Sequence, residues 1–232
     1  MKKSATLALP LSLLLLAGCD QASTSPDAPT NDASPSEDAA PSADAAALED
    51  AAPSADAIPA PGDCYPGAAD GTFHSFSAAT FADPTVTRSM CDYRGDVVMV
   101  VNVAALCGYT PQYEALQGLQ DRYGASGFHV LGFLADDFRM QAGSKEEIEE
   151  CANRFGITFE QFDVVGVLPD SARGQHPLFS WITTQEGFEG PISWNFNKFL
   201  VSSEGTLINR WNQNVTPDDS EITSAIDAAL GL

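Results

Sequence analysis

The sequence predicts an α/β domain in which a mixed central sheet is flanked by helices. Residues 97–103 form a continuous apolar run rich in β-branched side chains, which is typical of a strand buried on both faces. Helix-start signals at residues 110–111 and 144–147 alternate with further short apolar runs. A chain of 232 residues with 44% hydrophobic content can form one domain with a core, together with additional segments.

The first predicted strand is followed by a helix and a second strand. Thr110 and Pro111 predict an N-cap and a first helical residue, and large side chains recur at near-helical spacing through residues 113–123. Gly124 is expected to end this helix, and the apolar run at residues 128–134 predicts the second strand.

The second half of the domain contains two more helices and a strand pair. Residues 144–147 are Ser-Lys-Glu-Glu, a capping box that opens a helix. Residues 199–211 predict a strand, a turn and a strand, and residues 216–219 cap a last helix. The order β-α-β-α-β-β-α fits a mixed sheet covered by helices, as in thioredoxin-like folds.

Residues 1–18 predict a lipoprotein signal peptide. Two lysines precede an apolar run at residues 7–17, which is too short to span a bilayer comfortably. The Leu-Ala-Gly-Cys sequence ending at Cys19 resembles the bacterial lipoprotein cleavage box, in which the Cys is lipidated. The alternative is a plain signal peptide with a chance Cys. Lipidation predicts a domain held at a membrane surface of the cell envelope and facing the periplasm, and Asp20 favours the inner membrane over the outer.

Residues 19–62 predict a disordered tether that leads to the folded domain at residues 63–232. The composition is dominated by Ala, Pro, Ser and Asp, with ten acids and no base between Asp20 and Asp63. Such a segment cannot bury enough apolar surface to offset the entropy lost on ordering. An Ala-rich amphipathic helix is the alternative, but the recurring Pro and Ser disfavour it.

The charge and the histidines exclude several classes of function. The net charge is -21, and residues 64–232 alone carry 22 acids against nine bases. Because nucleic acids are bound mainly through Lys and Arg, we expect no nucleic-acid partner. His74, His129 and His176 show no ligand spacing with the cysteines, so we expect no metal site, and no motif predicts a cofactor.

Cys107 is the candidate nucleophile. It lies at the end of the first buried strand, just before the predicted helix start. Free amides at a helix N-terminus favour the thiolate, which is the nucleophilic form of Cys. A buried inert Cys fits this position equally well. Thr110 occupies the place of a second Cys in a C-x-x-C motif, which argues against a thioredoxin-type dithiol.

Three segments of the sequence resemble signatures of the glutathione peroxidase family. They are residues 101–113 (VNVAALCGYTPQY), 132–138 (GFLADDF) and 193–200 (SWNFNKFL), and they fall in family order. The resemblance extends over roughly residues 73–230. It implies a thioredoxin-fold peroxidase in which the Cys107 thiolate attacks a hydroperoxide and becomes a sulfenic acid. It also implies that Trp194 and Asn195 supply N–H donors around the sulfur. For Trp194, an ordinary core aromatic is the alternative.

The resemblance gives the other cysteines roles. In family members that use Cys, a Cys at the position of Cys151 resolves the sulfenic acid into a disulfide, which requires local unravelling of its helix. A free buried Cys is the alternative. Cys64 and Cys91 then remain, and we expect them to form a structural disulfide, because the compartment beyond the inner membrane permits one.

One position departs from the family pattern. The second signature normally carries Asn-Gln where this chain has Asp136 and Asp137, and the Gln counts as a donor to the reactive sulfur. An ionised Asp only accepts hydrogen bonds and disfavours a neighbouring thiolate. Asp137 is therefore protonated, or turned outward with Gln141 or a backbone amide in its place, or the enzyme is slow. On the repulsion hypothesis, Asp137→Gln speeds oxidation of Cys107.

We therefore predict a thiol-dependent peroxidase that reduces hydrogen peroxide or organic and lipid hydroperoxides. The chain lacks the longer segment of tetrameric relatives, which favours a monomer and resembles members that take electrons from thioredoxin-like proteins. Two alternatives remain. One is a peroxide sensor or thiol-disulfide relay with little turnover, and the other is a non-catalytic binding module that retains the fold.

Overall fold

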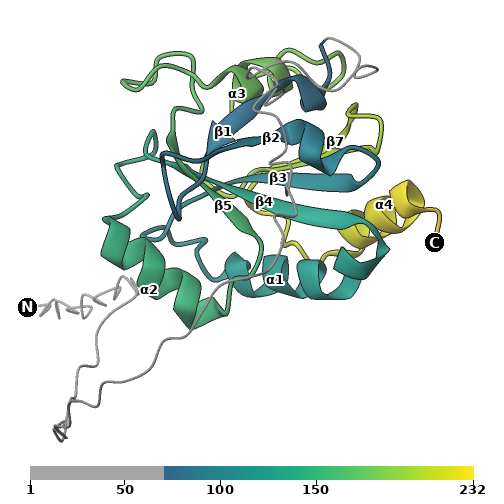
Figure 1. Cartoon of the computed structure of the whole chain (residues 1–232), viewed down its shortest axis with the longest axis horizontal. Coiled ribbons are helices and arrows are strands. Elements are labelled where there is room, and N and C mark those ends of the chain that lie inside the picture. The colour runs from purple at the N-terminus through teal and green to yellow at the C-terminus, as the bar shows by residue number, and fades with distance from the viewer. Residues whose placement is uncertain (1–70) are drawn as a thin grey trace, which may run out of the picture.

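The computed structural model describes residues 71–232, which form a five-stranded mixed sheet with helices on both faces (Figure 1). The sheet consists of β3 (Val97–Val103), β4 (Phe128–Ala135), β5 (Glu160–Val165), β6 (Lys198–Val201) and β7 (Leu207–Trp211), and a separate hairpin consists of β1 (Ser77–Ala79) and β2 (Thr87–Ser89). The helices are α1 (Gln112–Tyr123), α2 (Lys145–Phe155), α3 (Pro177–Ile182) and α4 (Ser220–Leu230), with short 3-10 turns η1 (Phe73–Ser75), η2 (Met90–Tyr93) and η3 (Gly124–Ser126).

Strand β3 lies at the centre of the sheet, whose order is β5-β4-β3-β6-β7. It runs parallel to β4 and antiparallel to β6, so that Val101 lies opposite both Gly132 and Lys198. All seven residues of β3 are buried, as the uninterrupted apolar run requires. The chain that leaves β3 therefore emerges in the middle of one sheet edge, and it carries Cys107 there.

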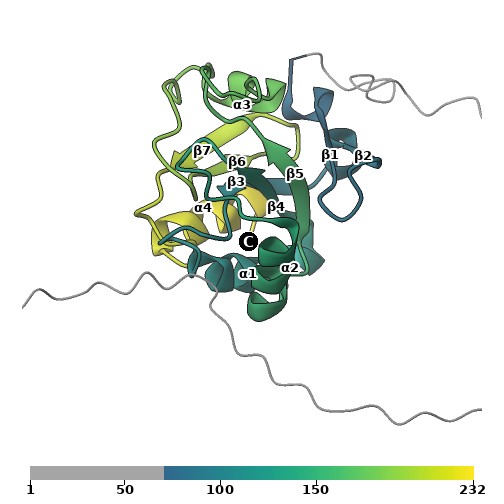
Figure 2. The same ribbon diagram turned by 90° about the vertical axis from the view of Figure 1, so that its left-hand side faces the viewer.

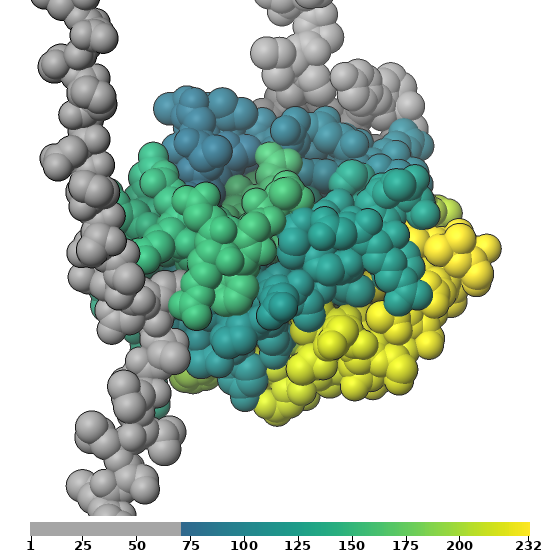
Figure 3. Space-filling model, turned by 90° about the horizontal axis from the view of Figure 1, so that it is seen from below, coloured from purple at the N-terminus to yellow at the C-terminus, as the bar shows by residue number. Residues whose placement is uncertain are grey.

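The two faces of the sheet have separate cores. Alternate β3 residues, including Met99 and Val101, pack with side chains of α1, α2 and α4. The intervening residues, including Val98 and Val100, pack with α3, η1 and η2. Figure 2 shows α3 on the opposite side of the sheet from α1 and α4, and Figure 3 shows the outer face that α1, α2 and α4 form.

The predicted strands and helices are present, and the structure contains several short elements that the sequence analysis did not predict. Ser144 and Glu147 form the predicted capping box of α2, with both reciprocal hydrogen bonds. The predicted Thr110 N-cap is wrong, because α1 begins at Gln112 and the Thr110 hydroxyl bonds back toward the end of β3. Strand β5, helix α3 and the β1-β2 hairpin were not predicted.

Candidate active site

Cys107 lies in the turn between β3 and α1 and is 3% exposed. Its backbone N–H donates to Oγ1 of Thr110 at 3.0 Å, and that hydroxyl donates to the carbonyl oxygen of Ala104 at 2.9 Å. Thr110 therefore closes the turn around Cys107 instead of capping the helix.

A backbone donor points at the sulfur of Cys107. The N–H of Tyr109 lies 3.5 Å from Sγ of Cys107, within hydrogen-bonding range for sulfur. This donor was not predicted, because a backbone amide leaves no mark in the sequence. A backbone N–H at this distance can donate to the sulfur of a thiol or of a thiolate.

Trp194 and Asn195 lie in the segment that precedes β6, and Asn102 of β3 holds that segment. The side-chain amide of Asn102 donates to the carbonyl oxygen of Trp194 at 2.9 Å and accepts from the N–H of Asn197 at 3.0 Å. Asn102 is fully buried and lies five residues before Cys107. The same strand thus positions both predicted halves of the site.

The indole of Trp194 is half-buried and packs against both cores. Its ring lies 5.2 Å from that of Phe138, and the guanidinium of Arg139 lies over it at 5.7 Å. Trp194 therefore joins the segment before β6 to the loop that follows β4.

Asn195 is fully buried and contacts Gln141 from the loop after β4. Its Nδ2 donates to Oε1 of Gln141 at 3.0 Å, whereas its Oδ1 has no hydrogen-bond partner among the described residues. The backbone carbonyl of Gln141 accepts from the N–H of Leu106 at 3.0 Å. Gln141 thus connects Asn195 to the residue that directly precedes Cys107.

Asp137 forms its hydrogen bonds with the segment after β5. Its Oδ2 accepts from the backbone N–H groups of Val167 and Leu168, which follow β5. Both donors are backbone amides, so this oxygen acts as an acceptor and faces the segment after β5. This geometry agrees with the alternative in which Asp137 turns outward, and Gln141 bonds to Asn195.

Cys151 lies on α2 and is buried in the same core cluster as Cys107. Neither cysteine is part of a disulfide in the described part of the chain. The two sulfurs therefore share one face of the sheet, and Cys151 is held in a helix that is capped at both ends.

The other predicted cysteine sites lie partly outside the described residues. Cys19 and Cys64 precede residue 71, so lipidation and the Cys64–Cys91 pairing stay predictions. Cys91 lies in η2, with its sulfur 3.1 Å from the carbonyl oxygen of His74. Within residues 71–232, no cluster of three His, Cys, Asp or Glu side chains is arranged to hold a metal ion. No helix in this range has the length and apolar character of a membrane span.

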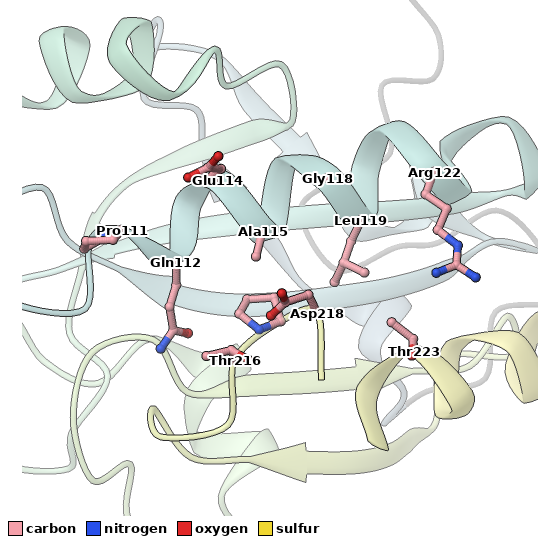
Figure 4. A pocket seen from close by; sticks show the side chains of 11 residues that line it. Pro111, Gln112, Glu114, Ala115, Gly118, Leu119, Arg122, Thr216, Asp218 and Thr223 are labelled. Atoms are coloured by element: carbon pink, nitrogen blue, oxygen red, sulfur yellow. The ribbon is translucent and has the colours of Figure 1, made fainter. Parts of the chain in front are cut away.

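A groove of about 510 Å³ runs along α1 beside the loop before α4 (Figure 4). Ala115, Gly118 and Leu119 lie on its α1 side, and Thr216 and Asp218 face them from the loop. None of the predicted site residues lines it, so it is separate from the reactive sulfur.

Solved structures share this fold. The structure titled "Crystal structure of Trgpx in apo form" matches 69% of this chain and 96% of its own, with 29% identity and a TM-score of 0.53. A thiol:disulfide interchange protein of the thioredoxin family from Chlorobium tepidum TLS matches with a TM-score of 0.51 at 16% identity, covering 69% of this chain and 96% of its own. The fold is therefore thioredoxin-like, as the order of elements predicts.

Sequence comparisons identify the family. The sequence model of the family "Glutathione peroxidase" matches residues 73–183. "Hydroperoxy fatty acid reductase gpx1" of Synechocystis sp. is 39% identical over 173 residues, covering 70% of this chain and 98% of that protein. "Thioredoxin/glutathione peroxidase BtuE" of Escherichia coli is 35% identical over 162 residues, covering 60% of this chain and 87% of that protein. The chain belongs to the glutathione peroxidase family and is a thiol-dependent peroxidase.

Proposed function

We propose that Cys107 and Cys151 carry out the peroxidase reaction in two steps. The Cys107 thiolate attacks the terminal oxygen of the hydroperoxide. The O–O bond breaks, Cys107 becomes a sulfenic acid, and the released oxyanion takes up a proton to leave as water or an alcohol. The Cys151 thiolate then attacks the Cys107 sulfur and forms a disulfide, releasing water. Two thiols of an external reductant reduce that disulfide.

The observation that carries this proposal is the donor at the Cys107 sulfur. The Tyr109 N–H lies 3.5 Å from Sγ, at the turn that leads into α1. Donors fixed before the reaction stabilise the thiolate and the charge that develops in the transition state, without reorganisation. Because Cys107 is 3% exposed, little water competes for the sulfur.

Asn195 and Trp194 are proposed as further donors, with Gln141 supporting Asn195. A 180° rotation of both amides keeps the 3.0 Å contact between Asn195 and Gln141, with Gln141 then donating. That rotation turns the Asn195 N–H groups toward the position where Oδ1 has no partner among the described residues. Asn195 is then free to donate to a charged sulfur or oxygen.

Resolution by Cys151 requires α2 to open. The sulfur of Cys151 is buried beneath a helix that has a capping box at one end and Gly156 in the left-handed conformation at the other. Local opening of such an element has a free energy below that of global unfolding. We propose that oxidation of Cys107 is followed by unwinding of α2, which brings the two sulfurs together.

The comparisons support the substrates and the reductant. One relative is named a hydroperoxy fatty acid reductase and another a thioredoxin/glutathione peroxidase. We propose that this chain reduces hydrogen peroxide and organic or lipid hydroperoxides, and that a thioredoxin-like thiol protein regenerates it. We also propose that it acts as a monomer.

We propose that the peroxidase is anchored in the cell envelope through lipidated Cys19 and faces the periplasm, with residues 19–62 as the tether. We further propose the Cys64–Cys91 disulfide near the start of the domain. Within residues 71–232, Cys107 and Cys151 take part in no disulfide, which supports this pairing.

Mass spectrometry of the purified protein after one equivalent of hydrogen peroxide tests the two-step reaction. We expect a Cys107–Cys151 disulfide in the parent protein and a trapped Cys107 sulfenic acid in the Cys151→Ser variant. An unmodified Cys107 would refute the assignment. Steady-state turnover with a thioredoxin system separates the peroxidase from the alternative of a peroxide sensor, which would show little turnover.

A further inference from the structure

Lys198 is a fully buried lysine at the first position of β6, directly after the segment that carries Trp194 and Asn195. Its Nζ donates to Oε1 of Gln112 at 2.7 Å, to the carbonyl oxygen of Phe196 at 2.9 Å and to that of Asn212 at 3.3 Å. An ammonium group has three N–H donors and no acceptor, so three oxygens satisfy it completely. A neutral amine would direct its lone pair at one of them.

The charge of Lys198 is unusual in its surroundings. The ion pairs within residues 71–232 do not include Lys198, and its three acceptors are uncharged oxygens. Lysines are rarely fully buried unless they are paired. Burial lowers the pKa of Lys198 to about 7, because the charged form loses its hydration. Among the described residues, Lys198 is the lysine that bears this desolvation.

The three oxygens belong to three segments that frame the site. Gln112 is the first residue of α1, five residues after Cys107. Phe196 directly follows Asn195, and Asn212 directly follows β7. Lys198 therefore connects the segment that bears the proposed donors to the helix that follows the reactive sulfur.

The bond to Phe196 holds a strained backbone. Phe196 has φ of 65°, a left-handed conformation that residues other than Gly rarely adopt. Its N–H donates to the carbonyl oxygen of Asn102 at 2.6 Å, and its own carbonyl accepts from Lys198. These two bonds fix the residue next to Asn195, so the ammonium contributes directly to the orientation of that amide.

The loop after β7 extends the same network. Gln112 donates to the carbonyl oxygen of Gln213 at 2.6 Å, and the hydroxyl of Ser193 donates to the side chain of Gln213 at 2.9 Å. The hydroxyl of Tyr109 donates to Asn214 at 2.7 Å. The loop thus contacts both the turn that contains Cys107 and the segment before β6. Lys198 bonds to the start of this loop through the carbonyl oxygen of Asn212.

We propose that Lys198 is a positioning residue for the peroxidase reaction. Its ammonium locks the Trp194–Asn195 segment to the start of α1, so that the donors and the Cys107 sulfur keep a fixed relative placement. Lys198 acts through Phe196 and Gln112 and not by contact with the peroxide. This inference rests on the proposed roles of Cys107 and Asn195.

The test is the full-length Lys198→Met variant, which keeps a long unbranched side chain, one atom shorter, and removes the charge. Stopped-flow tryptophan fluorescence measures the rate of Cys107 oxidation by hydrogen peroxide, and thermal unfolding measures stability. We expect the rate to fall at least about tenfold and the emission of the reduced protein to change as Trp194 shifts. Leu207→Ala is the control, because it removes a buried side chain at the opposite end of the β6-β7 pair. It should lower the melting temperature and leave the oxidation rate within about twofold of the parent.

Two outcomes would overturn the proposal. One is a Lys198→Met variant that loses stability as Leu207→Ala does but is oxidised as fast as the parent. The other is a nuclear magnetic resonance spectrum of lysine-labelled parent protein at pH 6 that lacks a protected, slowly exchanging ammonium. If Lys198→Met does not fold, Gln112→Met removes the acceptor that links Lys198 to α1, together with the bond from Gln112 to Gln213. This variant should also slow oxidation, and an unchanged rate there would refute the proposal. Failure of the proposed role of Cys107 can be distinguished from failure of the Lys198 proposal, because Cys107→Ser would then retain peroxidase activity.

Discussion

Gln141 carries the most specific prediction, because this residue joins Asn195 to the chain beside Cys107. Its side chain contacts Nδ2 of Asn195 at 3.0 Å, and its backbone carbonyl accepts from Leu106 at 3.0 Å. Gln141→Ala keeps the backbone bond and deletes the contact to Asn195. Asn195 is fully buried and its Oδ1 already has no partner within the described residues, so the variant leaves both ends of the amide unsatisfied.

The size of the effect follows from the cost of that unsatisfied donor. Leaving a buried polar group without a partner costs about 1–3 kcal/mol. If Asn195 reorients to avoid this cost, the donor is lost from the site, and the rate of Cys107 oxidation falls roughly 5- to 150-fold. Stopped-flow fluorescence in a Cys151→Ser background isolates this first step from disulfide formation.

Two further variants decide the interpretation of the Gln141 result. Gln161→Ala is the matched control, because it deletes a 3.0 Å bond from a glutamine amide to the Tyr113 hydroxyl. Its oxidation rate should stay within about twofold of the parent. Asp137→Asn keeps an acceptor for the amides of Val167 and Leu168 while it removes the charge, so the rate should be unchanged or higher. A Gln141→Ala variant as fast as the parent, or an Asp137→Asn variant slowed to a similar extent, would refute the proposal that Gln141 supports Asn195.

Three other results follow from the structure. Cys151→Ser should retain the oxidation of Cys107 but lose turnover with a thioredoxin system, and a variant with full turnover would show that Cys151 does not resolve the sulfenic acid. Ser144→Ala deletes the capping box and lowers the stability of α2 by about 1 kcal/mol. If α2 must open, the Cys107–Cys151 disulfide should form about fivefold faster in quenched-flow alkylation assays. Slower formation would contradict opening of α2. Burial lowers the pKa of His176 below its ordinary 6.5, so the unfolded state binds more protons and stability should fall as pH drops below about 6.5. His176→Asn keeps an oxygen that can cap α3, and melting temperatures at pH 7 and pH 5 should differ less in this variant than in the parent.

The fold was predictable where local signals and burial agree. Strand β3 is buried along its whole length, so it appears in the sequence as a continuous apolar run. The residues of the capping box mark the start of α2 in the sequence. Strand β5 lies at the edge of the sheet next to β4, with one isolated bridge from Phe162 to Thr80, and within it Phe162 alone is buried. Its pattern is neither an apolar run nor a strict alternation, and only pairing within the sheet defines it. Helix α3 has six residues, too few to establish a helical period.

The site was predictable only in its parts that have side-chain signatures. The place of Cys107 between a buried strand and a helix indicates a reactive thiol, and the resemblance to the family supplied Trp194 and Asn195. The Tyr109 amide was missed because backbone donors have no sequence signature. Lys198 lies within residues 193–200, which resemble a family signature. The sequence does not distinguish a buried ammonium from an exposed one, because the three partners of Lys198 are distant in sequence or belong to the backbone.

The loop after β4 explains how an aspartate can occupy the position of a family donor. Arg139 and Met140 both adopt left-handed conformations, with φ of 59° and 53°. Each costs about 1–2 kcal/mol for a residue with a Cβ, so other contacts must hold them. The bonds from Leu106 to Gln141 and from Ala105 to Ala142 are such contacts, because they bind the loop to the chain just before Cys107. The strained turn thus directs Asp137 to the amides after β5 and returns Gln141 to Asn195. The loop therefore places the neutral amide of Gln141 against Asn195, although the sequence has a carboxylate at position 137, where the family pattern has Gln.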